Sequence, residues 1–249
     1  MKPWKLVAAA VALLVVGGVC YVLSGLFGNP ISRALANSAA NKYIKANYAD
    51  LNLEAKPATY NLKTSSYSVV VQSRDSVDTH FAISCRPNGR VRGDNYDEAV
   101  LGGWNTFNRI SEEYRDFVGP LIEAGLPHDI QILIADLSMP EESSLADLPL
   151  DMEFDVYQNP LPTYVTLYVA SDSLSWEQVA KVATELDSVM RQHNLPVEQY
   201  TVVLQLLTDE GKPSESLGAY DFPPELLQST NLPQALEEHF IAWDEAASK

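Results

Sequence analysis

The sequence predicts an α+β protein that a single N-terminal helix holds in a membrane. Three observations carry this prediction. Residues 6–27 form one uncharged apolar run of 22 residues. Short segments that alternate apolar and polar residues follow it, and segments with helical periodicity lie between them. Because such alternation is typical of antiparallel sheets with one covered face, we expect two exported domains in which helices cover antiparallel sheets.

The apolar run is long enough to cross the ~30 Å hydrocarbon core as a helix. Lys2 and Lys5 precede it, and no acidic residue occurs before Asp50. The positive-inside tendency therefore predicts that residues 1–5 lie in the cytoplasm and that residues 28–249 are extracellular. The expected localisation is the cell membrane, crossed once, with the membrane itself as the first partner.

Two processing signals compete with a retained anchor. Cys20 near the end of the run resembles a lipoprotein signal, although Val19 stands where a small residue is expected. Residues 34–36 have the A-x-A form of a secretory cleavage site, but Arg33 intervenes and the run exceeds a typical signal h-region of ~7–15 residues. A retained transmembrane anchor at residues 6–27 is the preferred interpretation.

Charge is distributed unevenly along the chain. Residues 1–49 carry five basic and no acidic residues, residues 50–118 carry 8 basic and 10 acidic, and residues 119–249 carry 4 basic and 23 acidic. Because the C-terminal half is so acidic, nucleic acid repels it, and nucleic-acid binding is excluded. Of the two cysteines, Cys20 lies inside the apolar run, so a scaffold stapled by disulfides is also excluded.

The first exported domain is expected at residues 28–120. Asn29 and Pro30 fit the start of a helix, and an apolar residue recurs every four positions along one face of it. The residues of that face are Ile31, Leu35, Ala39 and Tyr43. Strands are predicted at 58–63, 67–72 and 80–86, and the dipeptide Asn88-Gly89 predicts a tight hairpin into 90–92.

A helix is then predicted from about Tyr96 to Phe117, interrupted by Gly102-Gly103 and ended by Gly119-Pro120. The order of the first domain is therefore α-β-β-β(-β)-α.

The second, acidic domain is expected at residues 121–249. Its apolar alternation predicts strands whose inward residues start with Ile130, Met152, Val165 and Tyr200. Ser175 and Gln178 form a capping box that starts a helix. A Pro-marked stretch at 213–224 precedes a C-terminal helix, which gives the order β-β-β-α-β-α.

Two groups of residues in this domain are candidate sites. Asp151, Glu153 and Asp155 alternate with apolar residues and would project from one strand face, which offers oxygen ligands to a divalent metal. Carboxylates on one face repeat ~6.6 Å apart, so a solvated acidic face is the alternative. Tyr164 and Tyr168 lie opposite an apolar row and could form a binding surface, although tyrosines are also ordinary strand formers.

Motifs for catalysis are missing from the sequence. It contains no H-x-x-x-H, H-E-x-x-H, C-x-x-C, G-x-S-x-G, phosphate loop or dinucleotide fingerprint. We therefore expect no cofactor and no catalytic residue.

Three segments of the first domain together resemble a known family. They are Tyr60-Asn61-Leu62-Lys63, Tyr67-Ser68-Val69-Val70-Val71 and Ser76-Val77-Asp78-Thr79-His80-Phe81, followed by the Asn-Gly hairpin. This pattern is similar to the YfjL-like family of uncharacterised, membrane-anchored proteins of Gram-positive bacteria. The resemblance implies an exported two-domain protein and assigns no activity or site residue. The α-β-β-β order is also similar to PepSY-like and cystatin-like units by topology alone.

The resulting expectation is a single-pass, membrane-anchored extracellular module that binds another membrane or secreted protein, or regulates one, without catalysis. The alternative is an exported enzyme or divalent-metal-dependent protein that uses acidic residues of the second domain.

Overall fold

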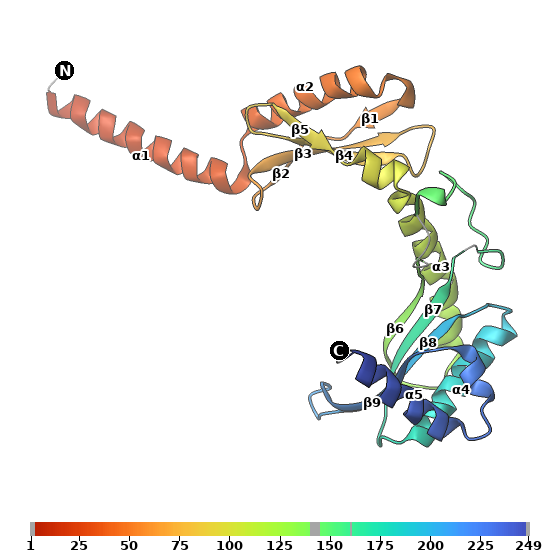
Figure 1. Ribbon diagram of the computed structural model, residues 1–249. Coiled ribbons are helices and arrows are strands. Elements are labelled where there is room, and N and C mark those ends of the chain that lie inside the picture. Colours follow the sequence, from red (N-terminus) through yellow and green to blue (C-terminus); the bar gives the residue numbers. More distant parts are fainter. Residues whose placement is uncertain (1–2, 140–144, 160, 248–249) are drawn as a thin grey trace. The chain divides into compact units, whose positions relative to one another are not determined.

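The computed structural model of the protein describes residues 3–139, 145–159 and 161–247. They divide into two compact units (Figure 1). The first unit comprises Met1–Thr106 and Leu148–Asp151, and the second comprises Phe107–Asp147 and Met152–Lys249. Each unit is an antiparallel or mixed sheet with helices packed against it, so the expected α+β class is confirmed.

Helix α1, Pro3–Phe27, contains the apolar run. Its 18-residue window Ala10–Phe27 is long and apolar enough to cross a membrane, and none of that window is buried inside the protein. It is the one such helix among the described residues. A signal sequence near an N-terminus satisfies the same criterion.

The first unit is built on a five-stranded antiparallel sheet. Strand β3 (Ser66–Ser73) pairs with β4 (His80–Cys85), which pairs with β5 (Val91–Asp94). On its other side β3 pairs with β1 (Leu53–Ala55) and, farther along, with β2 (Thr59–Asn61). The inward residues of β3 and β4 alternate as expected and are almost completely buried: Tyr67, Val69, Val71, Phe81, Ile83 and Cys85.

Helix α2, Pro30–Asn47, packs across this sheet (Figure 1). Asn29 caps it, since its side chain accepts a hydrogen bond from the Ser32 backbone N–H at 2.8 Å. The buried stripe is Ser32, Ala36, Ala40 and Ile44. The expected stripe of Ile31, Leu35, Ala39 and Tyr43 is therefore wrong by one position: Ile31 and Leu35 are exposed, and Ala39 and Tyr43 are only partly buried. Small residues win because they allow close approach to the sheet, where the Cys85 thiol lies 3.8 Å from the Ala36 carbonyl oxygen.

Helix α3, Trp104–Gly125, follows a short π-helical turn η2 at Asp97–Leu101. The expected end of this helix at Gly119-Pro120 is wrong, because the helix continues through Pro120. A buried stripe of apolar side chains along the helix stabilises the continuation and outweighs the hydrogen bond that proline removes: Ile110, Tyr114, Val118 and Ile122. Residue 120, the expected domain boundary, therefore lies inside α3, while the two units divide between Thr106 and Phe107.

The second unit holds a four-stranded sheet in the order β6-β7-β8-β9. The strands are β6 (Ile130–Leu137), β7 (Thr163–Ala170), β8 (Gln199–Leu207) and β9 (Pro213–Phe222). Strands β7 and β8 are parallel, unlike the expected antiparallel arrangement, because helix α4 (Trp176–Gln192) connects them as a crossover. Helix α5 (Leu232–Ala247) packs against α4 and β9. Further short turns are η1 (Ala49–Leu51), η3 (Leu145–Asp147) and η4 (Pro224–Gln228).

Two expectations for the second unit fail. The segment around Met152–Val156 is not a strand but a loop with turns. Conversely, the Pro-marked stretch contains the strand β9. Helix α5 lies along the outer side of this strand, where the His239 ring nitrogen Nε2 lies 2.9 Å from the Tyr220 carbonyl oxygen. A covered edge strand tolerates Pro213 at its first position, which the sequence pattern alone does not reveal.

Candidate functional site

Tyr164 and Tyr168 lie on the face of the second sheet opposite to the one that α4 covers. Alternate residues of β7, from Thr163 to Val169, are buried, and Val169 and Leu204 contact the same small cavity as Val182 of α4. The intervening residues of β7, which include both tyrosines, are partly exposed. Their expected position opposite the apolar row is confirmed.

The strand register extends this face onto β6. Ile132 pairs with Tyr168, Ile134 with Thr166, and Asp136 with Tyr164. Paired residues point to the same side of a sheet, so these six side chains form one surface, which we call the open face. Ile132 and Ile134 are 44% and 40% exposed. Two exposed isoleucines beside two tyrosines make a mixed apolar and hydroxyl-bearing surface of the kind found at protein interfaces.

An aromatic cluster borders the open face. Tyr220 of β9 stacks on Trp243 of α5, with ring centroids 4.6 Å apart and planes at 16°. The Trp243 Nε1–H donates a hydrogen bond to the Asp221 carboxylate at 3.1 Å. Burial raises the pKa of the Tyr220 hydroxyl, and a hydrogen bond with the Tyr168 hydroxyl acts in the same direction. The cluster therefore lies beside Tyr168 of the open face.

Charged groups lie at the Tyr164 end of the open face. Burial raises the pKa of Tyr164, the nearby Asp136 carboxylate adds to the increase, and Arg115 opposes it. The Arg115 Nε atom lies 3.6 Å from Asp136 Oδ2. The Tyr164 phenol therefore stays protonated at neutral pH and can donate as well as accept hydrogen bonds. The arrangement suits recognition of a partner rather than proton transfer.

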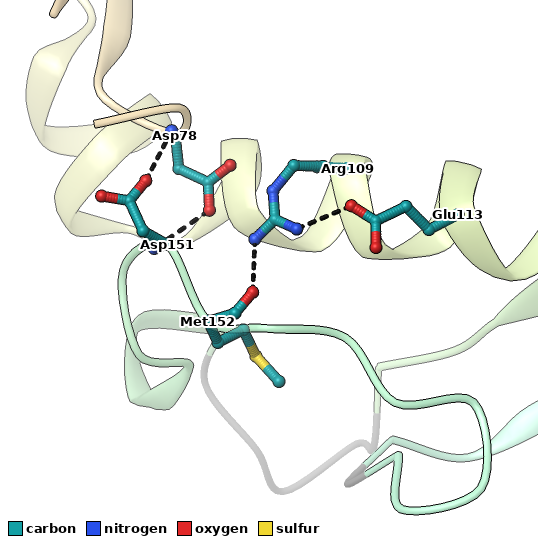
Figure 2. Close-up of polar contacts among 5 residues, drawn as sticks. All are labelled: Asp78, Arg109, Glu113, Asp151 and Met152. Atoms are coloured by element: carbon teal, nitrogen blue, oxygen red, sulfur yellow. Dashed lines mark hydrogen bonds and ion pairs between the residues drawn. The ribbon is translucent and has the colours of Figure 1, made fainter. Parts of the chain in front are cut away.

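The carboxylates expected to share one strand face do not do so. The Asp151 carboxylate belongs to the first unit, where Oδ1 accepts a hydrogen bond from the Asp78 N–H at 2.8 Å (Figure 2). The Ser76 hydroxyl donates to the same oxygen at 2.9 Å. Glu153 is exposed, and Asp155 closes a local turn by accepting from the Tyr157 N–H at 2.9 Å. Across the part of the chain that the structure describes, no three His, Cys, Asp or Glu side chains group in a way that could hold a metal ion.

The loop that carries Met152 is held by α3 within the second unit. Arg109 Nη2 donates to the Met152 carbonyl oxygen at 2.7 Å, and its Nη1 pairs with Glu113 at 2.7 Å (Figure 2). The ring of Phe154, farther along this loop, packs edge-on against Tyr114 of α3. These contacts explain why the segment is a packed loop rather than a strand: its apolar side chains pack against a helix.

A second candidate site is a polar cavity of about 530 Å³ at the carboxyl ends of β7 and β8. It is lined by His128, Asp129, Ser171, Asp172 and Gln178, among others. His128 Nε2 lies 2.6 Å from Glu185 Oε2 on α4. Sequence spacing gives no sign of this pair, because 57 residues separate its members. Ligands of sheets with parallel strands commonly bind outside their carboxyl ends.

The serine in this cavity is not set up as a nucleophile. The Ser171 hydroxyl lies 2.7 Å from the Ser173 carbonyl oxygen and 3.0 Å from Gln178 Oε1, so its single hydrogen is used by those acceptors. A nucleophilic serine needs its proton directed at a general base. The cavity is therefore equipped for binding a polar molecule.

Two family descriptions match this chain. The YfjL-like N-terminal domain matches residues 3–95, and the YfjL-like C-terminal domain matches residues 113–237. No curated protein and no solved structure matches the chain.

Proposed function

The chain belongs to the YfjL-like family, and from this premise we propose that it is a single-pass, membrane-anchored extracellular module that binds or regulates another protein without catalysis. The observation that carries the proposal is the open face, where Ile132 and Ile134 stand 44% and 40% exposed beside Tyr164 and Tyr168. Contiguous exposed apolar side chains on a protein surface mark interaction sites. The apolar window of α1 supports the anchor, and Lys2 and Lys5 before the apolar run support the orientation, although Arg33, Lys42 and Lys45 after it reduce the charge difference.

The partner of the open face is a protein with an apolar surface that can accept hydrogen bonds from two phenols. Tyrosine and isoleucine supply area at low entropy cost, and the Tyr220–Trp243 stack lies beside Tyr168. Strong acidity of residues 119–249 also favours a partner with basic residues around its apolar centre.

Photocrosslinking in intact cells tests this proposal. A photoreactive amino acid replaces Ile134 or Tyr164 on the open face, and Asp209, an exposed residue in the turn between β8 and β9, serves as the matched control. We expect one discrete crosslinked species from the two open-face positions and none from position 209. The Ile132→Asp substitution should abolish that species. Equal crosslinking from all three positions, or none from any, contradicts the proposal.

Protease accessibility tests the anchor and its orientation. Protease added to intact cells should digest residues 28–249, and the protein should remain with the membrane after a carbonate wash. Recovery in the wash, or protection until the cells are lysed, contradicts the anchored extracellular arrangement.

The His128–Glu185 cavity favours a second candidate function, in which an exported protein acts on or binds a small polar molecule. A stabilisation screen with polar metabolites and divalent metals tests it. A compound that raises the unfolding temperature of the native chain but not of a Gln178→Ala, Asp129→Asn variant would support this function. No stabilisation by any compound would remove it.

A further inference from the structure

We propose that the end of the first unit next to α1 is a docking site for the anionic phospholipid headgroups of the membrane. This inference rests on the proposed function, because it treats α1 as the membrane anchor. It adds a second, electrostatic attachment that holds the first unit against the bilayer surface.

The last turn of α1 is fixed to the first sheet. The Tyr60 hydroxyl donates to the Gly25 carbonyl oxygen at 2.8 Å, and the Asn29 N–H donates to the Tyr67 hydroxyl at 2.7 Å. Gly28 has a φ of 72°, and a β-carbon there would lie 2.6 Å from the Tyr67 hydroxyl oxygen. The turn that joins β2 to β3 therefore lies directly beside the end of α1.

Three segments of the first unit meet at this end, which we call the junction end: residues 28–36, 60–66 and 85–91. The first begins α2, the second holds the turn between β2 and β3, and the third holds the hairpin turn between β4 and β5. Gly89 in the hairpin turn contacts Leu35 of α2, since a β-carbon on Gly89 would lie 3.1 Å from the Leu35 β-carbon. In Figure 1, α1 departs from the same end of the unit at which α2 begins.

The junction end is purely basic. Its charged residues are Arg33, Lys63, Arg86 and Arg90, and its three segments contain no aspartate or glutamate. All four side chains are exposed, and none forms an ion pair with another described residue. The acidic residues of the same unit lie in its other segments: Asp50, Glu54, Asp75, Asp78, Asp94, Asp97, Glu98 and Asp151. Those other segments also hold basic residues, namely Lys42, Lys45, Lys56, Arg74 and Arg92, so the junction end differs from them by its lack of acidic residues, which suits it to an anionic surface.

Exposed apolar side chains accompany the basic ones. Ile31 is 74% exposed and Leu62 is 55% exposed, and both lie within the junction end. The packing of α2 explains Ile31, because the helix buries Ser32 and Ala36 and turns Ile31 away from the sheet. Basic groups beside exposed apolar and tyrosine side chains are the composition that sits at the boundary of headgroups and acyl chains.

A cavity of about 590 Å³ lies at the same place, between α1 and the sheet. It is lined by Gly17, Val22, Ser24 and Gly25 of α1 together with Asn29, Tyr60, Ser65, Tyr67 and Pro87. The apolar window of α1 ends at Phe27, so in a membrane crossed by this window the part of the cavity at Ser24, Gly25 and Asn29 lies near the headgroups, while Gly17 lies in the hydrocarbon region. The polar lining at the headgroup level comes from Ser24, Asn29, Tyr60 and Ser65, and the basic side chains of the junction end lie in the neighbouring turns.

The test uses the full chain in vesicles of phosphatidylcholine alone or with one third phosphatidylglycerol. Hydrogen–deuterium exchange is measured in residues 61–65 and 86–90. We expect exchange in both turns to slow about fivefold or more in the anionic vesicles, the factor that roughly one basic residue near an anionic surface provides. Glycerol phosphate added to neutral vesicles should give no protection; protection by it alone would overturn docking on the bilayer.

The Lys63→Glu, Arg86→Glu, Arg90→Glu variant should lose this slowing. A matched variant, Lys42→Glu, Lys45→Glu, Lys56→Glu, changes net charge equally but outside the junction end, and it should retain the slowing. Lys42 lies nine residues beyond Arg33, roughly 14 Å farther along α2.

The two proposals fail separately. If the native chain does not float with neutral vesicles, α1 is not an anchor and the proposed function is contradicted. If it floats but the two turns exchange equally in both kinds of vesicle, or if both variants behave alike, the headgroup site is wrong and the anchor stands.

Discussion

Asp78 and Asp151 each accept a hydrogen bond from the backbone of the other. The Asp151 N–H donates to Asp78 Oδ2 at 3.1 Å, and the Asp78 N–H donates to Asp151 Oδ1 at 2.8 Å. The Ser76 hydroxyl adds a third contact to the same Asp151 oxygen, at 2.9 Å. Asp78 is 1% exposed, and Asp151 has a φ of 57°, a conformation that aspartate tolerates better than most residues. These hydrogen bonds attach residues 148–151 to the turn before β4.

Replacing Asp151 should destabilise the first unit. Asp151→Ala removes an acceptor of two hydrogen bonds and places a β-carbon without a polar group at positive φ, so we expect a loss of about 2–3 kcal/mol in unfolding free energy. Asp151→Asn keeps Oδ1 and should cost less. Urea unfolding measures both, with the exposed Glu153→Ala as control, expected within about 0.5 kcal/mol of the native chain. If Asp151→Ala is as stable as that control, the hydrogen bonds of the Asp151 carboxylate do not contribute to the unfolding free energy.

Gly28 should be irreplaceable where α1 meets the sheet. Gly28→Ala meets a positive φ of 72°, and its β-carbon would lie 2.6 Å from the Tyr67 hydroxyl oxygen and 2.8 Å and 2.9 Å from Tyr60 Cγ and Cβ. Gly211→Ala has a similar φ of 74° but nothing within 4 Å, so it isolates the backbone term of about 1–2 kcal/mol. We expect faster amide exchange at Asn29 in Gly28→Ala, because the Tyr67 hydroxyl that accepts its N–H must move. Unchanged exchange at Asn29 would contradict the clash.

The two faces of the second sheet should respond differently to mutation. Ile134→Thr on the open face should change the unfolding free energy by less than about 1 kcal/mol, because the side chain is already 40% exposed. Leu167→Ala removes a fully buried side chain and should cost about 2–5 kcal/mol. Thermal unfolding of both variants checks this difference. A large loss from Ile134→Thr would mean that the open face is covered in the folded protein.

Alkaline pH should weaken the second unit. Burial raises the pKa of Tyr114 to about 12 and raises that of Tyr200 further. The unfolded chain loses these protons near pH 10, before the folded one does, so stability is intact below pH 10 and falls as the pH rises toward 12. The loss from Tyr114 is of order 2 kcal/mol at pH 12.

Urea unfolding at pH 8 and pH 11.5, followed by tryptophan fluorescence, measures this loss. Tyr114→Phe should be less sensitive to pH than the native chain. Tyr157→Phe, which removes a hydroxyl from an exposed side chain, is the matched control. Equal pH dependence in all three proteins would show that Tyr114 does not contribute.

The sequence correctly predicted those features that depend on residues close together in the chain. The apolar run of α1, the capped start of α4 and the alternation of β7 were all predictable, and so was the face on which Tyr164 and Tyr168 lie. The stripe of α2 was not, because periodicity favours Ile31 and Leu35, whereas close packing on the sheet selects Ser32 and Ala36. The strand expected at 152–156 has the right alternation, yet α3 holds it as a loop through Arg109.

Only part of the candidate site could be predicted, because tertiary packing and not local sequence brings its other residues together. The other residues of the open face come from β6, and the aromatic cluster that borders it comes from β9 and α5; only the strand register and tertiary packing bring Ile132, Tyr220 and Trp243 near Tyr168. The His128–Glu185 pair likewise joins the segment before β6 to a helix that follows β7.

The reciprocal hydrogen bonds between Asp78 and Asp151 also constrain how the two segments of this protein can evolve. Asp78 lies in the segment matched by the N-terminal family domain, residues 3–95, but Asp151 lies in the segment matched by the C-terminal one, residues 113–237. A recombination that exchanged the second segment for a relative's would also replace the four residues that complete the first unit. The two domains are therefore not freely interchangeable modules, and substitutions at Asp78 and Asp151 should be selected together.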